Sequence, residues 1–215
     1  IVIQPVVPSY RKGFFEAVRA ILGDKFTVYA SDMDMGVLTE QAENKPWHRS
    51  LGPILRLGPG VEWQKGAMSV SISRGDMIVV CGAPRCLSNM LLLLKARLKG
   101  ARTIWWGQLW SGTSRGHRFI LRLALMRLAH AMLFYTDAEI VTYNARFGRW
   151  DGRRIGALNN GIDVKPIQKH RAPYSARDRA NEILFIGRIT EKARIDLLLA
   201  AMQQGPLANA ILNVI

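Results

Sequence analysis

Short runs of apolar, mostly β-branched residues alternate along this chain with longer stretches whose apolar residues recur at the period of an α-helix. Two strands that run in the same direction need a long connection between them, and that connection is usually a helix. The alternation is therefore typical of a parallel sheet covered by helices. We predict an α/β fold for this chain.

The expected strands are 1–4, 26–30, 77–81, 103–106, 132–135, 183–186 and 210–215. The expected helices are 12–22, 88–99, 116–131, 138–147 and 194–203. Thr136 and Glu139 have the spacing of a capping box, which predicts a helix start directly after the fifth strand. Gly23 and Gly100 follow helical runs, where a left-handed cap is expected. Residues 31–75 are less regular, with a turn at 58–60.

The chain changes character after residue 158. An Asn-Gly turn lies within 159–163, and the segment that follows is polar and basic, with two prolines. A new strand-helix-strand pattern then begins. We predict a first domain at 1–158, an interdomain linker at 159–180 and the beginning of a second α/β domain at 181–215. Both ends resemble interrupted strands, so we expect the chain to be truncated, more seriously at its carboxyl end.

The charge is strongly positive and unevenly placed. The chain has 30 Lys and Arg against 16 Asp and Glu, a net charge of +14, and no acidic residue lies between Asp76 and Asp137. Such a block favours anionic partners: phosphates, acidic lipid or nucleic acid. Basic residues interrupt both long apolar runs, so we expect no membrane-spanning helix. Cys81 and Cys86 suit reduced thiols in a cytoplasmic protein.

Ligands of open parallel sheets bind at the carboxyl ends of strands, where loops lead into helix amino termini. The loops expected there are 8–13, 82–85, 106–114 and 187–192. Their candidate cleft residues are Tyr10, Arg11, Lys12, Gly13, Arg85 and Gln108. Cations at helix starts are also often merely solvated, and glycines are often plain turns. No group of residues with the spacing of metal ligands is visible, so we expect no metal site.

One segment carries a family resemblance. The run ILFIGRITEK from Ile183 to Lys192, followed by IDLLLAA, resembles the start of the carboxyl-terminal domain of GT-B glycosyltransferases, especially the retaining family 4. The stretches 135–139 and 155–163 resemble that family's strand-helix unit and its interdomain turn. The loop from Val7 to Arg11 resembles the opening loop of one subgroup.

The resemblance implies a GT-B fold with a complete acceptor-side domain and an incomplete nucleotide-sugar domain. The implied activity is retaining, metal-independent transfer of a sugar from a nucleotide-diphosphate sugar to an acceptor, without a cofactor. Arg188 and Lys192 match the pair that contacts the donor diphosphate. The paired glutamates of the family are expected beyond Ile215, so the resemblance implies that this chain alone is inactive, and it assigns no catalytic residue. Ala193 replaces the family's usual glycine.

The basic block suggests a membrane contact. Arg115, Arg118 and Arg122 lie near one another on the expected helix 116–131 and its approach, beside several apolar residues. Such a surface suits an anionic membrane, which would fit a lipid-linked or polysaccharide acceptor and a peripheral position on the inner face of the membrane. The same residues also suit a solvated face or ordinary packing against the sheet.

Two other classes remain open. A non-enzymatic basic Rossmann-like module would bind polyanions or anionic membrane through 77–136. No recognised nucleic-acid motif is present, so we do not expect nucleic acid as a partner. A nucleotide-sugar epimerase is less favoured, because no G-x-G-x-x-G follows the first strand and no Tyr-x-x-x-Lys pair occurs.

Overall fold

The computed structural model describes residues 1–35, 38–43, 45–110, 116–148, 150–159, 161–171, 181–187 and 189–215, the side chains of Pro166 and Lys192 apart. The chain divides into two compact units, Ile1–Val164 and Lys165–Ile215. This division lies inside the segment 159–180 that the sequence indicates as a linker.

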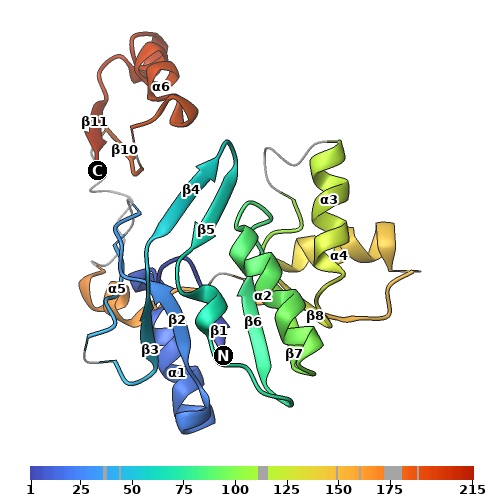
Figure 1. Cartoon of the computed structure of the whole chain (residues 1–215). Coiled ribbons are helices and arrows are strands. Elements are labelled where there is room, and N and C mark those ends of the chain that lie inside the picture. The colour runs from blue at the N-terminus through green and yellow to red at the C-terminus, as the bar shows by residue number, and fades with distance from the viewer. Residues whose placement is uncertain are drawn as a thin grey trace. The chain divides into compact units, whose positions relative to one another are not determined.

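The first unit is built on a seven-stranded sheet in the order β3-β2-β1-β6-β7-β8-β9 (Figure 1). Every neighbouring pair in this sheet is parallel. Its strands are β1 Val2–Ile3, β2 Val28–Ser31, β3 His48–Leu51, β6 Met77–Cys81, β7 Arg102–Trp106, β8 Ala131–Phe134 and β9 Arg154–Ala157. The α/β prediction is confirmed, and the strand order is that of a Rossmann-like doubly wound sheet.

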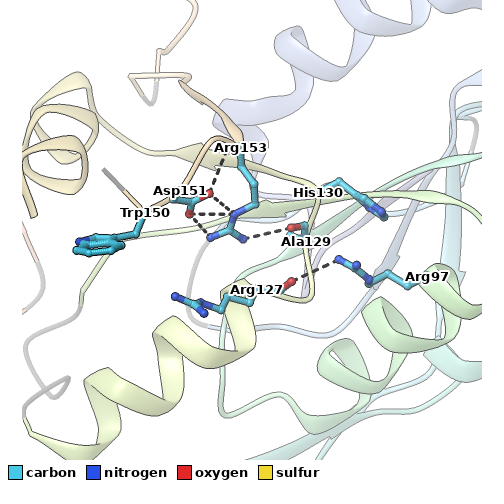
Figure 2. A pocket seen from close by; sticks show the side chains of 7 residues that line it. All are labelled: Arg97, Arg127, Ala129, His130, Trp150, Asp151 and Arg153. Atoms are coloured by element: carbon cyan, nitrogen blue, oxygen red, sulfur yellow. Dashed lines mark hydrogen bonds and ion pairs between the residues drawn. The ribbon is translucent and has the colours of Figure 1, made fainter. Parts of the chain in front are cut away.

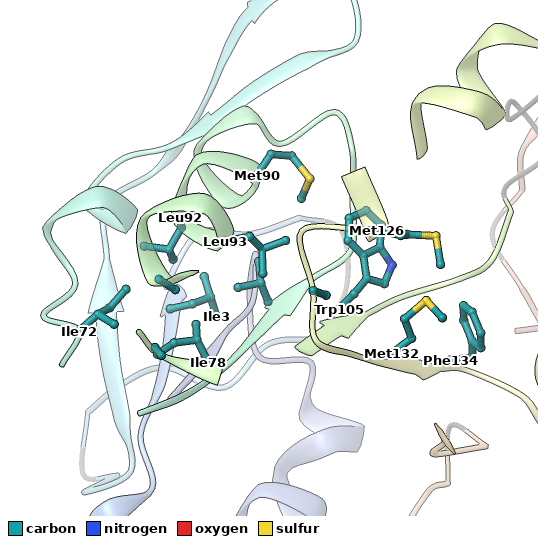
Figure 3. Packing of buried hydrophobic residues seen from close by; sticks show 14 of the residues in the cluster. Ile3, Ile72, Ile78, Met90, Leu92, Leu93, Trp105, Met126, Met132 and Phe134 are labelled. Carbon is teal, nitrogen blue, oxygen red and sulfur yellow. The ribbon is translucent and has the colours of Figure 1, made fainter. Parts of the chain in front are cut away.

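Helices cover both faces of this sheet because successive strand residues point to opposite sides. In β1, Ile3 faces the larger core cluster and Val2 the smaller one. The larger cluster lies beneath α2 Leu87–Leu98, the end of α3 His117–Met126, and α4 Asp137–Phe147 (Figure 3). The smaller cluster lies beneath α1 Lys12–Leu22.

The predicted elements of the first unit are confirmed to within about two residues at most ends. The capping box is present: the amide of Glu139 donates to Thr136 Oγ1 (3.3 Å) and the amide of Thr136 donates to Glu139 Oε2 (3.1 Å). Gly23 and Gly100 both have positive φ, but the ψ of −143° at Gly23 lies outside the left-handed helical region, so Gly23 is not a left-handed cap.

The helix expected to reach residue 131 ends instead at Met126. Tight turns follow, in which the amides of Leu128 and Ala129 bond three residues back, and His130 then donates to Thr103 to begin β8. The carbonyls of Arg127 and Leu128 are taken by the guanidinium of Arg97. This contact comes from a distant helix, so local periodicity does not reveal it.

The irregular region contains three strands that the sequence did not indicate. One is β3, and the other two form an antiparallel hairpin of β4 Ile54–Gly58 and β5 Val61–Gln64, with the expected turn at its tip. Strand β9 was also missed. Strands β3, β4 and β9 alternate apolar and polar residues poorly, and β5 alternates over only four residues, so none of them stands out in the sequence.

The second unit contains α5 Lys165–His170, β10 Glu182–Phe185, α6 Ile195–Met202 and β11 Ile211–Val214. The two strands are parallel, with Glu182 opposite Ile211. The predicted strand-helix-strand order is confirmed, whereas α5 lies in a segment expected to have no regular structure. None of the described residues of this unit is buried.

Across the described residues of both units, no helix is long and apolar enough to cross a membrane.

Candidate functional site

The strand order creates a topological switch point in the first unit. Strand β1 lies between β2 and β6 in the sheet. The chain first adds β2 and β3 on one flank of β1, and then adds β6 to β9 on the other flank. In sheets of this kind the loops diverge at the carboxyl ends of the two central strands and leave a crevice there. The loops after β1, β6 and β7 therefore define the candidate site.

Arg11 is a buried cation at this edge. Its guanidinium carbon lies 4.5 Å from the ring centre of Trp106, 5.5 Å from that of Tyr10 and 5.6 Å from that of Tyr135. Its Nη1 donates to Gln4 Oε1 at 3.0 Å. The side chain is only 7% exposed. Cation–π contacts of this type help to hold a guanidinium in place.

Burial raises the pKa of Tyr135 more than the nearby Arg11 lowers it. Burial likewise raises the pKa of the Cys81 thiol, to about 11. Both groups are therefore protonated at neutral pH, and Cys81 is not a thiolate nucleophile. The side chains of Tyr135 and Cys81 are thus neutral beside the cationic guanidinium of Arg11.

The other predicted residues of this first loop lie around Arg11. Tyr10, Lys12 and Gly13 are all exposed, and Tyr10 together with Phe14 forms an aromatic rim. The ring centres of Phe14 and Trp106 are 5.9 Å apart. A Cβ at Gly13 would make only ordinary contact, so packing does not require glycine at that position.

The candidate cleft residue Arg85 contacts the hairpin β4–β5. Its Nε lies 3.1 Å from Glu62 Oε2, and its carbonyl accepts from the Glu62 amide at 2.7 Å. The side chain is 60% exposed. Arg85 therefore attaches the hairpin β4–β5 to the loop after β6.

The position of Arg122 contradicts the prediction that it faces a membrane together with Arg115 and Arg118. It is 8% exposed, and its Nη1 donates to the carbonyls of Gly82 (3.3 Å) and Gln108 (3.1 Å). Burial lowers its pKa. Arg122 points toward the sheet because the loops after β6 and β7 present carbonyls there. The assignment of Arg122 to the membrane surface is wrong, whereas Arg118 is exposed and Arg115 lies outside the described residues.

The candidate cleft residue Gln108 thus contributes its carbonyl to Arg122, while its side chain is exposed. Next to it, the amide of Leu109 donates to Glu139 Oε1 at 2.7 Å. The other carboxylate oxygen of Glu139 accepts from the amides of Tyr135 and Thr136, each at 3.1 Å. Glu139 therefore joins the loops after β7 and β8. The capping-box spacing identified this residue, but not its long-range bond.

Two glycines bring these loops into close contact. A Cβ on Gly82 would lie 2.2 Å from Trp105 Nε1, and a Cβ on Gly107 would lie 3.0 Å from the Gly82 carbonyl oxygen. The Trp105 ring is fully buried. Sequence reasoning missed these contacts because they depend on the pairing of β6 with β7.

In the second unit, position 192 lies in the 3₁₀ turn Glu191–Ala193, between β10 and α6. Arg188 lies outside the described residues. Arg194 begins α6 in a left-handed conformation and pairs with Asp196 at 3.0 Å. The backbone therefore places position 192 at a loop-to-helix junction that follows the carboxyl end of a parallel strand.

The described residues contain no group of three or more His, Cys, Asp or Glu side chains that could hold a metal ion. No protein-family model, curated protein or solved structure matches this chain.

Proposed function

We propose that this chain is the acceptor-side domain and the beginning of the donor domain of a GT-B glycosyltransferase. The reaction is transfer of a sugar from a nucleotide-diphosphate sugar to a carbohydrate or lipid-linked acceptor. The main support is the order of the two units along the chain: a doubly wound parallel sheet is followed by a strand-turn-helix-strand unit with parallel strands. Position 192 lies in the turn of the second unit.

In the proposed reaction the nucleoside diphosphate gains negative charge as the bond to the sugar breaks. Fixed cations and helix amino termini stabilise such charge when no metal does so. Arg188 and Lys192 would supply these cations, the arginine as a planar fork and the lysine as a point charge. The exposed rings of Tyr10 and Phe14 offer an apolar surface for an acceptor sugar beside the buried Arg11.

Donor binding tests this proposal. Fluorescent or radiolabelled UDP- and GDP-sugars are titrated into the full-length gene product and into its Arg188→Ala and Lys192→Ala variants. We expect each variant to weaken donor affinity by about tenfold or more, because a charge-assisted contact to phosphate is lost. Lys169→Ala, at an exposed lysine of α5, serves as the control. Wild-type affinity and turnover in both test variants would contradict the donor site.

A second candidate function, attachment to an anionic membrane, is favoured by the outer face of α2. Leu87, Leu91, Leu94 and Leu98 recur there at intervals of four, three and four residues, which places them on one side of the helix. Their exposed fractions are 42, 38, 41 and 81%. The acid-free block supplies exposed basic residues at Arg97, Lys99 and Arg118.

Sedimentation with lipid vesicles tests the membrane candidate. We expect binding to vesicles that contain about 30% phosphatidylglycerol, and weak binding to phosphatidylcholine alone. Leu91→Ser with Leu94→Ser should abolish binding, whereas Ile21→Ser, at a residue of α1 that is 81% exposed, should not. Salt-sensitive binding to heparin, combined with no binding of nucleotide sugars by the full-length product, would instead favour the non-enzymatic polyanion-binding module.

A further inference from the structure

The hairpin of β4 and β5 presents an apolar face to solvent. Leu55 is paired with Trp63, so these two side chains lie on the same face, and Val61 shares that face because it lies two residues before Trp63. Leu55 is 44% exposed and Val61 is 38% exposed, while Trp63 is partly buried. Leu57, at the register shift beside the turn, is 58% exposed.

The other face of the hairpin is turned toward the first unit. Glu62 and Gln64 flank Trp63 in β5, so their side chains point to the opposite side. The Glu62 carboxylate lies 3.1 Å from Arg85 Nε. The Gln64 side chain is fully buried and donates to the carbonyl of Gln4 at 2.9 Å. These contacts hold one face of the hairpin against the unit, so the apolar face points away from it.

The hairpin also lies alongside the start of α2. Glu62 forms a parallel β-bridge with Cys86, and two residues later in β5 the backbone amide donates to Ser88 Oγ at 2.9 Å. In this register Trp63 lies beside Leu87, the first residue of α2. Cys86 and Ser88 are buried, whereas Leu87 is exposed. Leu87 is therefore on the same outer side as Trp63.

The exposed leucines of α2 continue the apolar face of the hairpin. Leu87 is the first of the four leucines on the outer side of the helix, and Figure 1 shows the hairpin beside α2. Single exposed apolar residues are ordinary, but a contiguous set from two elements marks an interaction surface. We call this set the hairpin–helix face; it consists of Leu55, Leu57, Val61, Trp63, Leu87, Leu91, Leu94 and Leu98.

The charge around the hairpin–helix face distinguishes between possible partners. Segments 54–64 and 85–99 together hold five Lys and Arg residues and one acidic residue. Arg97, next to Leu98 in the last turn of α2, is held there by a hydrogen bond to the carbonyl of Arg127 (Figure 2). A second copy of the chain would bring like charges together, which opposes association. Anionic lipid headgroups would instead be attracted.

We propose that the hairpin–helix face lies on an anionic bilayer and that the hairpin tip, residues 57–61, enters the boundary between headgroups and acyl chains. The five residues of the tip carry no charge, and Pro59 has no amide hydrogen to remove from water. Binding at this boundary depends on buried apolar area together with attraction to anionic lipid. The inference rests on the membrane-attachment candidate above and names the element that enters the bilayer.

Sedimentation with vesicles of phosphatidylcholine containing about 30% phosphatidylglycerol tests the proposal. Leu57→Ser with Val61→Ser should weaken vesicle binding by about tenfold or more, because two apolar side chains no longer leave water. Ile21→Ser with Leu22→Ser is the matched control. Both of these residues are exposed on α1, which covers the other face of the sheet, so we expect wild-type binding.

Leu57→Trp is the complementary variant, because a gain in affinity cannot result from misfolding. An indole is favoured at the headgroup boundary, so vesicle affinity should rise by about threefold. If the wild type binds vesicles and the Leu57→Ser, Val61→Ser variant binds equally well, the role of the hairpin is overturned and attachment through α2 alone still stands.

Absence of vesicle binding by the wild type would overturn both this inference and the membrane-attachment candidate. Analytical ultracentrifugation without lipid addresses the other occupant of the face. We expect the same sedimentation for the wild type and for Leu57→Ser with Val61→Ser. A wild-type dimer that these substitutions dissociate would overturn the bilayer assignment in favour of a second copy of the chain.

Discussion

At the scale of single residues, Gly82 determines how closely β6 and β7 approach at the candidate site. Gly82→Ala would place a methyl group 2.2 Å from Trp105 Nε1, and the buried indole has no room to move. We expect the free energy of unfolding to fall by about 2 kcal/mol. Urea denaturation measures this change. Gly152→Ala, where a Cβ would meet nothing within 4 Å, is the control, and an equal effect at both positions would contradict the packing role.

The Asp151–Arg153 pair makes a pH-dependent contribution to stability. Hydrogen bonds from Arg153, and a smaller contribution from Tyr143, hold the pKa of Asp151 well below its usual range. The folded state therefore favours the carboxylate. Its stabilisation is complete above the unfolded pKa of about 3.9 and is lost as the pH falls toward the lower folded pKa.

Asp151→Asn should accordingly reduce the free energy of unfolding at pH 7 by about 2 kcal/mol. The difference from the wild type should shrink below about pH 4. Urea titrations at several pH values measure both effects. The ion pair of Arg19 with the exposed Asp24 provides a control, since Asp24→Asn should change little at any pH. A difference between wild type and Asp151→Asn that did not vary with pH would contradict this role of the carboxylate.

Predictions from the sequence were correct for residues whose hydrogen-bond partners lie in the same turn. They failed for residues whose partners are distant in the sequence. Thr136 and Glu139 were identified by their spacing because both lie in the same turn. Arg122 was misassigned because its partners, the carbonyls of Gly82 and Gln108, belong to two other loops. An amphipathic pattern identifies an apolar face, but it does not show that a charged side chain is buried against backbone carbonyls.

At the scale of elements, Glu139 has two functions at the amino end of α4: it completes the capping box and it binds the Leu109 amide. Thr136→Ala removes one cap hydrogen bond and should cost about 1 kcal/mol. Glu139→Ala removes the reciprocal bond and also the acceptor of the Leu109 amide, so it should cost about 2 kcal/mol. Denaturation measures these costs, and hydrogen exchange should show faster exchange at Leu109 only in the Glu139 variant. Equal exchange at Leu109 in both variants would contradict the link.

Long strand and helix patterns predicted most elements of the first unit, because burial on both faces makes parallel strands continuously apolar. The pattern fails in the hairpin β4–β5, where Leu55, Leu57 and Val61 are exposed. It also fails at β9, an edge strand that begins with Arg154. Apolar residues recur at a regular period where one face of an element is buried. Elements that bury few side chains therefore lack this pattern and are missed.

At the scale of the whole molecule, the two units differ in their cores. Both core clusters of the first unit consist of residues up to Leu158. We therefore expect residues 1–164 alone to unfold cooperatively, with a near-UV spectrum like that of the longer chain. Residues 165–215 alone should be unfolded, since none of the described residues of this unit is buried and strands and short helices without a buried core are not independently stable. Circular dichroism of both fragments tests this, and a non-cooperative 1–164 would contradict it.

The boundary between the units was predictable because composition changes there. The sequence also indicated which loops would meet at the carboxyl edge of the sheet, because parallel topology determines where loops converge. The roles of Arg11, Arg85 and Arg122 were not predictable, because each contacts residues that are distant in the sequence. Arg11 is covered by aromatic rings, Arg85 pairs with Glu62, and Arg122 donates to loop carbonyls.

The strand order also sets the timing of folding. β1 is the earliest strand in the chain and yet lies in the middle of the sheet, where Val2 pairs with both Val28 and Val79. The pairing with β6 is the distant one: Val2 and Val79 are 77 positions apart, whereas Val2 and Val28 are 26 apart and Met77 and Arg102 of the pair β6–β7 are 25 apart. Closing a long loop costs more entropy and slows folding. We therefore expect β6, α2 and β7 to assemble first, and the insertion of β1 beside β6, which completes the switch-point crevice, to limit the folding rate.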